Sequence, residues 1–234
     1  RMDQSSGMPG YGPDSPFLGQ APYTLLFYQA ELQKRYLAMS RKVFRSQNPY
    51  ALLNTPIADD PALAFVEMFS DSLFSPQFNP GITIPIELVA PLESRYFDWV
   101  VRKYQTPEAA LAAWNDRLES DDIENKRLGL LPSGMLSADA LSAAPVHRKR
   151  ASDQARFFTT FMREFYANTR FWFQQEAGLK CPVVASSQAT ADEMTVGPLE
   201  HYASLSCDAF SMRHSIAGQM RLQRSDRLTP GDLY

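Results

Sequence analysis

One acidic side chain of this sequence follows an apolar run, at a place where a carboxyl group can take part in acid–base chemistry. Asp71 lies between Ser70 and Ser72, shortly after the apolar run 63–68. A carboxyl group at the end of a buried strand can exchange a proton with a substrate bound at the edge of the sheet. An aspartate beside serine is also common in turns, where its oxygens accept hydrogen bonds from backbone N–H groups. The sequence leaves both interpretations of Asp71 open.

Further polar side chains close the later apolar runs and are candidates for substrate binding. Ser186 and Gln188 close one run, and His214 closes the run 207–214. With Ser70 they offer hydroxyl, amide and imidazole groups, which bind polar ligands through hydrogen bonds. A histidine at a strand end that bonds only to backbone is the alternative for His214.

Other kinds of chemistry have no support in the sequence. No spacing of His, Cys, Asp or Glu is typical of a metal site, and no glycine-rich phosphate loop follows an apolar run. No nearby His–Asp pairing indicates a serine hydrolase. The two cysteines, Cys181 and Cys207, are interpreted as small buried apolar residues. We therefore expect neither a metal nor another cofactor.

The composition predicts a globular chain without a nucleic-acid or membrane partner. Of the 234 residues, 44% are hydrophobic, and the net charge is only −3. This charge gives no electrostatic reason to bind nucleic acid. No run approaches the ~20 apolar residues of a membrane span. The basic run at 147–150 is interpreted as a solvated surface.

The elements that must position these side chains alternate along the chain. Short apolar runs at 63–68, 181–187 and 207–214 predict strands, and the first lacks the alternation of a half-exposed strand. Helical spacing and caps predict helices at 22–46, 92–104, 106–114, 153–177 and 198–204. Such alternation predicts an α/β fold with a parallel sheet, either doubly wound or a (β/α) barrel.

The longest of these helices is the best-defined element. Phe157, Phe161 and Phe165 recur four residues apart, which places them on one face of the helix 153–177. Gly178 predicts its end, because glycine readily adopts the left-handed conformation that follows a helix. The stripe of phenylalanines is therefore expected to be core.

Composition also divides the chain. Residues 1–22 are rich in Gly, Pro and Ser and predict an extended loop. The segment 23–216 is interpreted as the folded body, with a flexible insertion at 119–152 that is first charged and then rich in Ala, Ser and Pro. Residues 217–234 show only weak periodicity and are interpreted as a tail.

Several stretches together resemble one enzyme family. They read "DDPALAFVE" at 59–67, "FDWVVRKYQTPEAALAAW" at 97–114 and the block from Asp153 through "GLKCPVVASSQ" to Gln188. "DAFSMRH" at 208–214 follows in the order that the family has. These blocks resemble retaining glycoside hydrolases of the clan that includes cellulase-like and β-galactosidase-like enzymes.

The resemblance implies a fold and a degenerate catalytic motif. It implies part of a (β/α)8 TIM barrel, with the runs at 63–68, 181–187 and 207–214 as its fourth to sixth strands. The family has an Asn-Glu pair after the fourth strand, whereas this chain has Ser70 and Asp71 or, in a second alignment, Ser70 alone over the glutamate. Asp71 would then be a shortened acid, or the acid would be missing.

The function that the resemblance implies follows from this motif. We expect a catalytically impaired barrel protein that serves as a binding or structural subunit of a larger assembly. The alternative is an active retaining β-glycosidase with Asp71 as acid/base. The expected partners are a β-linked carbohydrate, held in part by His214, or proteins of the larger complex. The resemblance also implies a periplasmic or extracellular location.

Overall fold

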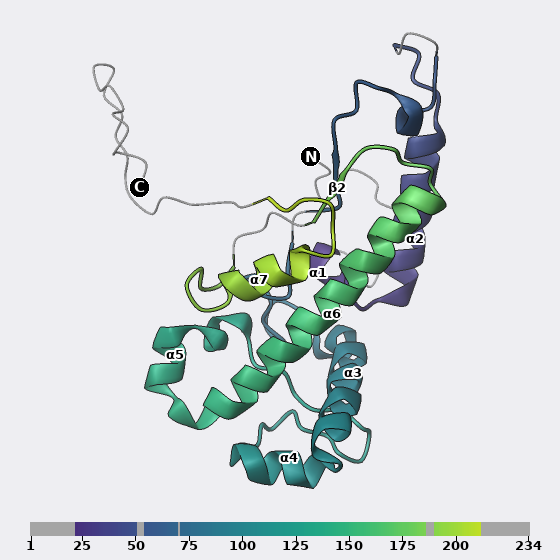
Figure 1. Cartoon of the computed structure of the whole chain (residues 1–234). Coiled ribbons are helices and arrows are strands. Elements are labelled where there is room, and N and C mark those ends of the chain that lie inside the picture. The colour runs from purple at the N-terminus through teal and green to yellow at the C-terminus, as the bar shows by residue number, and fades with distance from the viewer. Residues whose placement is uncertain (1–21, 51–53, 70, 186–189, 212–234) are drawn as a thin grey trace, which may run out of the picture.

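The protein is folded mainly from helices that surround one long helix, α6 (Figure 1). The computed structural model describes residues 22–50, 54–69, 71–185 and 190–211. Its elements, in order, are α1 (Pro22–Leu26), α2 (Ala30–Arg45), η1 (Ile57–Asp59), β1 (Val66–Glu67), α3 (Ile86–Tyr104), α4 (Pro107–Trp114), η2 (Ser133–Leu136), α5 (Ala138–Ala143), η3 (Pro145–His147), α6 (Arg148–Gln175), β2 (Val183–Val184) and α7 (Gly197–Ser204).

Three segments that are far apart in the sequence form a small parallel ladder. β1 pairs with β2 in the register Val66↔Val183, and Val184 bridges to Ala209, also in parallel. The N–H of Met68 donates to the carbonyl of Val184 at 3.0 Å. The sequence predicts a strand at each of these three places. Their neighbourhood and parallel direction agree with that prediction, but the described part of the run 207–214 contributes only a single bridge, at Ala209.

The expected α/β fold, either as a (β/α)8 barrel or as a doubly wound sheet, is however wrong, because the protein is mostly helical. The described residues contain one sheet, and its two named strands are two residues long each. The run 63–68 was interpreted as buried on both faces, whereas Phe65 is 57% exposed and the N–H of Leu63 closes a turn onto the carbonyl of Asp60. A strand extends only where a neighbour bonds its backbone, and among the described segments β2 does so for β1 over a short stretch.

The core lies between helices instead of inside a barrel. The phenylalanine stripe predicted for the long helix is confirmed: Phe157 and Phe158 of α6 are buried, and Phe161 and Phe165 pack against the same core. The helix begins earlier than predicted, at Arg148, and Gly178 follows it with φ 75°, in the left-handed region that glycine favours. Aromatic burial on one helix face thus replaces the side-chain layers that a barrel interior requires.

The helix predicted over 22–46 is divided into α1 and α2. The chain turns at residues 27–29, and this turn directs Phe27 and Tyr28 into the core, where each is 1% exposed. The α4 prediction is confirmed in detail, because the Thr106 side chain accepts a hydrogen bond from the N–H of Ala109 at 3.1 Å.

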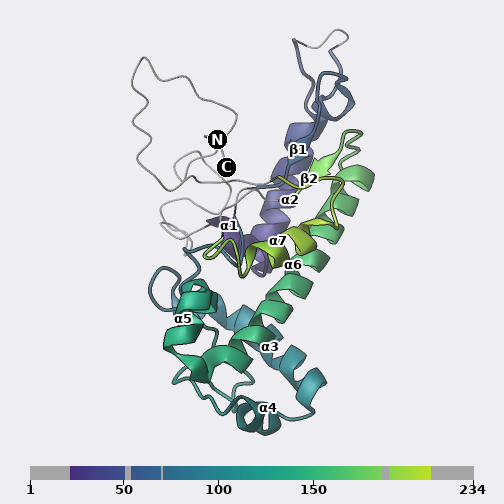
Figure 2. The same ribbon diagram turned by 60° about the vertical axis from the view of Figure 1, so that its left-hand side comes forward.

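The helices are distributed along α6 in a way that both views show. α2 lies beside the C-terminal half of α6, α3 and α4 lie beside its N-terminal half, and the β1–β2 ladder is at the end of the molecule opposite α4 (Figures 1 and 2). α7 packs on α6 as well. No helix among the described residues is long and apolar enough to cross a membrane.

Candidate functional site

Of the predicted site residues, the structure describes Asp71 alone. Ser70, Ser186, Gln188 and His214 lie outside the described residues. Their grouping therefore stays a prediction.

Asp71 is a buried carboxyl group that ties α1 to the loop after β1. It is 5% exposed. Its Oδ2 accepts hydrogen bonds from the backbone N–H and the hydroxyl of Thr24, at 2.8 and 2.5 Å, and its Oδ1 accepts one from the N–H of Ser72 at 2.8 Å. Burial raises the pKa of Asp71, and these hydrogen bonds oppose the rise. This geometry is that of a structural clamp between two segments.

A second buried carboxyl group lies next to this clamp and was missed by sequence analysis. Glu200 of α7 is 4% exposed. It accepts hydrogen bonds from the hydroxyl of Tyr166 at 3.1 Å and, at a very short distance, from the hydroxyl of Ser72. Burial raises the pKa of Glu200 to about 7, and the nearby Asp71 adds to the rise.

A signal for Glu200 was present in the sequence. Val196, Glu200 and Ala203 are spaced like one face of a helix, and all three are buried. An acidic residue on an otherwise apolar helix face indicates a buried carboxyl group that needs partners.

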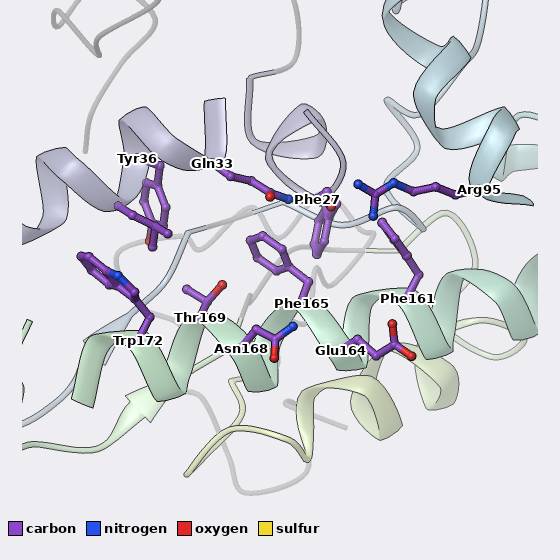
Figure 3. A pocket seen from close by; sticks show the side chains of 11 residues that line it. Phe27, Gln33, Tyr36, Arg95, Phe161, Glu164, Phe165, Asn168, Thr169 and Trp172 are labelled. Atoms are coloured by element: carbon purple, nitrogen blue, oxygen red, sulfur yellow. Dashed lines mark hydrogen bonds between the residues drawn. The ribbon is translucent and has the colours of Figure 1, made fainter. Parts of the chain in front are cut away.

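A groove between α2, α3 and α6 is the clearest concave surface among the described residues. Its volume is about 330 Å³. Figure 3 shows Phe165 and Trp172 directed from α6 toward α2, and Phe161 directed toward Arg95, which reaches in from α3. The complete lining is Phe27, Gln33, Tyr36, Leu37, Arg95, Phe161, Glu164, Phe165, Asn168, Thr169 and Trp172.

The spacing of the α6 residues explains why they share this groove. Phe161, Phe165 and Trp172 are four and seven residues apart, so they lie on one face of the helix. Phe27 packs against Phe165 with ring centroids 5.0 Å apart, which closes the floor of the groove from the α1 side. The groove thus has flat aromatic walls.

Polar side chains that form no hydrogen bond or ion pair within the described part of the chain lie along the same groove. The guanidinium of Arg95 lies 5.2 Å from the ring centre of Phe161 and forms no ion pair with any described residue. Glu164 and Asn168 are exposed, and no hydrogen bond from their side chains to a described residue is present. These groups keep their full capacity to bind a ligand.

Two polar side chains are already engaged and help to shape the groove. The amide of Gln33 donates to the carbonyl of Phe27 at 2.9 Å. The hydroxyl of Tyr36 donates to the carbonyl of Met68 at 2.7 Å. They connect the groove wall to α1 and to the segment after β1.

The described residues contain no group of three or more His, Cys, Asp or Glu side chains that could hold a metal ion. Cys181 and Cys207 are free and half-buried, and burial raises the pKa of the Cys207 thiol to about 12. A thiol with so high a pKa is a poor nucleophile near neutral pH.

Comparison with protein-family models, with curated proteins and with solved structures finds no match for this chain. The likeness to glycoside hydrolases therefore rests only on the sequence blocks at 59–67, 97–114, 153–188 and 208–214.

Proposed function

We propose that this protein is a non-catalytic binding subunit, related in sequence to retaining glycoside hydrolases, whose groove between α2, α3 and α6 binds a β-linked oligosaccharide. The observation that carries the proposal is that one groove combines flat aromatic walls with three polar side chains, Arg95, Glu164 and Asn168, that form no hydrogen bond or ion pair with any described residue. The guanidinium of Arg95 lies over the ring of Phe161.

The chemistry of a sugar ring fits such a lining. A pyranose has an apolar face of C–H groups and an edge of hydroxyl groups, each of which both donates and accepts a hydrogen bond. Aromatic faces can cover the first, as in other ligand pockets of mixed character. The carboxylate of Glu164, the amide of Asn168 and the guanidinium of Arg95 supply acceptors and donors for the second.

The state of the carboxyl groups supports a non-catalytic role. Retaining hydrolysis uses two carboxyl groups about 5–5.5 Å apart that both reach the substrate. Asp71 is buried and its oxygens accept hydrogen bonds from Thr24 and Ser72. In the groove, the only carboxylate among the lining residues is Glu164.

One observation favours a second candidate, an active β-glycosidase with Asp71 as acid/base. Burial raises the pKa of Asp71, and a raised pKa is a property of catalytic acids. Hydrolysis of a series of aryl β-glycosides separates the two candidates. We expect no turnover above the uncatalysed rate, whereas turnover that Asp71→Asn abolishes, in a variant that still folds, would favour the enzyme.

Binding is tested by calorimetry with β-linked oligosaccharides of glucose, galactose and mannose, and with an α-linked glucan as the comparison. We expect saturable binding of at least one β-linked series. Arg95→Gln, Glu164→Gln and Asn168→Ala should each weaken it about tenfold, since a hydrogen bond to a ligand contributes roughly 1–1.5 kcal/mol.

The matched control is Phe171→Ala. Phe171 also lies on α6, is 65% exposed and does not line the groove, so its loss should leave binding unchanged. The absence of binding to every β-linked series, or equal losses in Phe171→Ala and the groove variants, would refute the assignment of the groove.

A further inference from the structure

Glu200 connects three parts of the molecule at one buried point. It projects from α7, its carboxyl group bonds to Ser72 in the loop after β1, and it also bonds to Tyr166 in the middle of α6. Ser72 is fully buried, and its hydroxyl accepts a hydrogen bond from the N–H of Phe74 at 3.0 Å. The docking of α7 therefore depends on what this carboxyl group can bond to.

No cation among the described residues neutralises Glu200. Arg163 of α6 lies over the ring of Tyr202, at 4.6 Å, and Arg170 pairs with Asp208 at 2.7 Å. His201, the next residue in α7, packs against the ring of Phe210. The ionisable groups that do act on Glu200 are Tyr166 and the carboxyl group of Asp71.

We propose that Glu200 is a protonation-dependent latch, which holds α7 on α6 when its carboxyl group is neutral. The docked α7 also keeps the groove in its binding shape, and this second part rests on the proposed function. The carboxyl group is buried beside a second buried carboxyl group, and no cation in the described part of the chain faces it. In this place it is stable as a neutral acid and unstable as an anion.

The surrounding side chains can form hydrogen bonds with both the neutral and the ionised form of Glu200. In the neutral state, the Glu200 O–H donates to Ser72 Oγ, and the Ser72 hydroxyl is free to point at the sulfur of Met162, 3.9 Å away. In the anion, the hydroxyl groups of Ser72 and Tyr166 both donate to the carboxylate. Two neutral donors do not replace the hydration of a carboxylate, so loss of the proton favours undocking of α7.

The pH range of the latch follows from the sign of the shift. Burial raises the pKa of Glu200 from 4.5 to about 7. The neutral docked state is therefore fully favoured below about pH 4.5. Its advantage is lost progressively as the pH rises to about 7, and no further loss from this group is expected above that value.

Tyr166 carries the effect to the groove. Its ring lies 5.7 Å from that of Phe27 and 6.1 Å from that of Phe165, and both of these residues line the groove. When the hydrogen bond between the Tyr166 hydroxyl and Glu200 is lost, the Tyr166 ring is held less firmly behind Phe27 and Phe165.

The test is hydrogen exchange of the amides of residues 197–204 between pH 5 and 8, expressed as protection factors so that the pH dependence of intrinsic exchange is removed. In the wild-type protein, protection should fall about tenfold per pH unit between 5 and 7 and level off above pH 7. In Glu200→Gln, which keeps the shape without the charge, protection should not depend on pH.

The matched control is Glu193→Gln, because Glu193 is exposed, seven residues before Glu200. This variant should behave as the wild type. If Glu200→Gln does not fold, Tyr166→Phe provides the test: it removes a donor to the anion, so the level region should begin at a higher pH. Constant wild-type protection, or an unchanged pH dependence in Glu200→Gln or in Tyr166→Phe, would overturn the latch.

Oligosaccharide binding at pH 5.5 and 8, measured on the same proteins, separates this inference from the proposed function. The expected result is weaker binding at pH 8 in the wild type and equal binding in Glu200→Gln. Loss of α7 protection without any sugar binding at either pH would support the latch and refute the function of the groove. Equal binding at both pH values, together with loss of α7 protection, would refute the connection from Tyr166 to the groove.

Discussion

The first turns of α6 and its middle bury ionisable groups in two different ways. Near its N-terminus, Arg150 is fully buried, and its Nη1 and Nη2 donate hydrogen bonds to the two carboxylate oxygens of Asp121. In its middle, Tyr166 donates a hydrogen bond to Glu200, which no cation among the described residues neutralises, and the buried Asp71 lies nearby. Near the N-terminus of α6 a buried cation faces a buried aspartate, whereas the hydrogen-bond partners of Glu200 in the described structure are neutral hydroxyl groups.

The region around Arg150 includes a second acid. Burial alone would raise the pKa of Asp153, yet the hydrogen bonds from Lys103, Tyr104 and Trp114 together hold it below the usual value. Buried aspartates can therefore stay ionised in one part of this protein, because its cations and N–H donors point at them, while burial dominates in another. The charge state of a buried carboxyl group in this protein therefore depends on its partners and not on burial alone.

Breaking the pair of Arg150 and Asp121 should have the largest effect. Arg150→Met leaves Asp121 buried without its cation, which costs about 3–5 kcal/mol of the free energy of unfolding. Denaturant titration measures this loss, and Lys149→Met, at an exposed neighbour, is the control. A loss below about 1 kcal/mol would show that water or another group compensates Asp121 and that the two regions do not differ as described.

Glu93 lies near Arg150 and Asp121, but its own cation, Arg127, is close without forming a hydrogen bond. Arg127 Nε is 3.3 Å from the Glu93 carboxylate, and burial raises the pKa of Glu93 to about 7. Glu93 and Glu200 should each remove about 3 kcal/mol of stability as the pH rises from 4.5 to 7.

Unfolding titrations at pH 5, 6, 7 and 8 measure this dependence. Glu93→Gln and Glu200→Gln should each remove about half of it, and the double variant should be nearly independent of pH in this range. Stability that rises between pH 5 and 7 in the wild type would have the wrong sign and would contradict the neutral state of both groups.

The smallest expected effect is at the Asp71 clamp. Thr24→Val removes the hydroxyl that donates to Asp71 and keeps the side-chain shape, so the free energy of unfolding should fall by about 1 kcal/mol, the usual net value of one hydrogen bond. Thr160→Val, at an exposed position of α6, is the matched control. No change in Thr24→Val would mean that the backbone N–H groups alone hold this carboxyl group.

Local pattern predicted α3, α4 and α6, but it missed α5 inside the segment interpreted as a flexible insertion and the division of α1 from α2, and it predicted the sheet only in part. The stripe of phenylalanines predicted α6, and Thr106 and Pro107 predicted the start of α4, because helix signals lie within a few residues of one another. The apolar run at 63–68 predicted a strand that has only two residues in its paired part, because pairing depends on a neighbour distant in the sequence.

The candidate site was less predictable than the fold. The sequence drew attention to Asp71, whose environment depends on Thr24, 47 residues away. It gave Glu200 no role, although that residue lies on an apolar helix face. The basic run at 147–150 was interpreted as solvated, whereas Arg150 is buried, because its partner Asp121 comes from a segment whose position no local pattern reveals.

By itself, the sequence determined most of the long helices, α3, α4 and α6, and drew attention to Asp71 as an acidic residue to test. Only the tertiary structure decided that the aromatic core lies between helices, that α2, α3 and α6 leave a groove with unpaired polar groups, and which buried acids have cations beside them. The reason is physical: helix propensity and capping act over one or two turns, whereas burial, ion pairing and strand length depend on segments that meet only when the chain has folded.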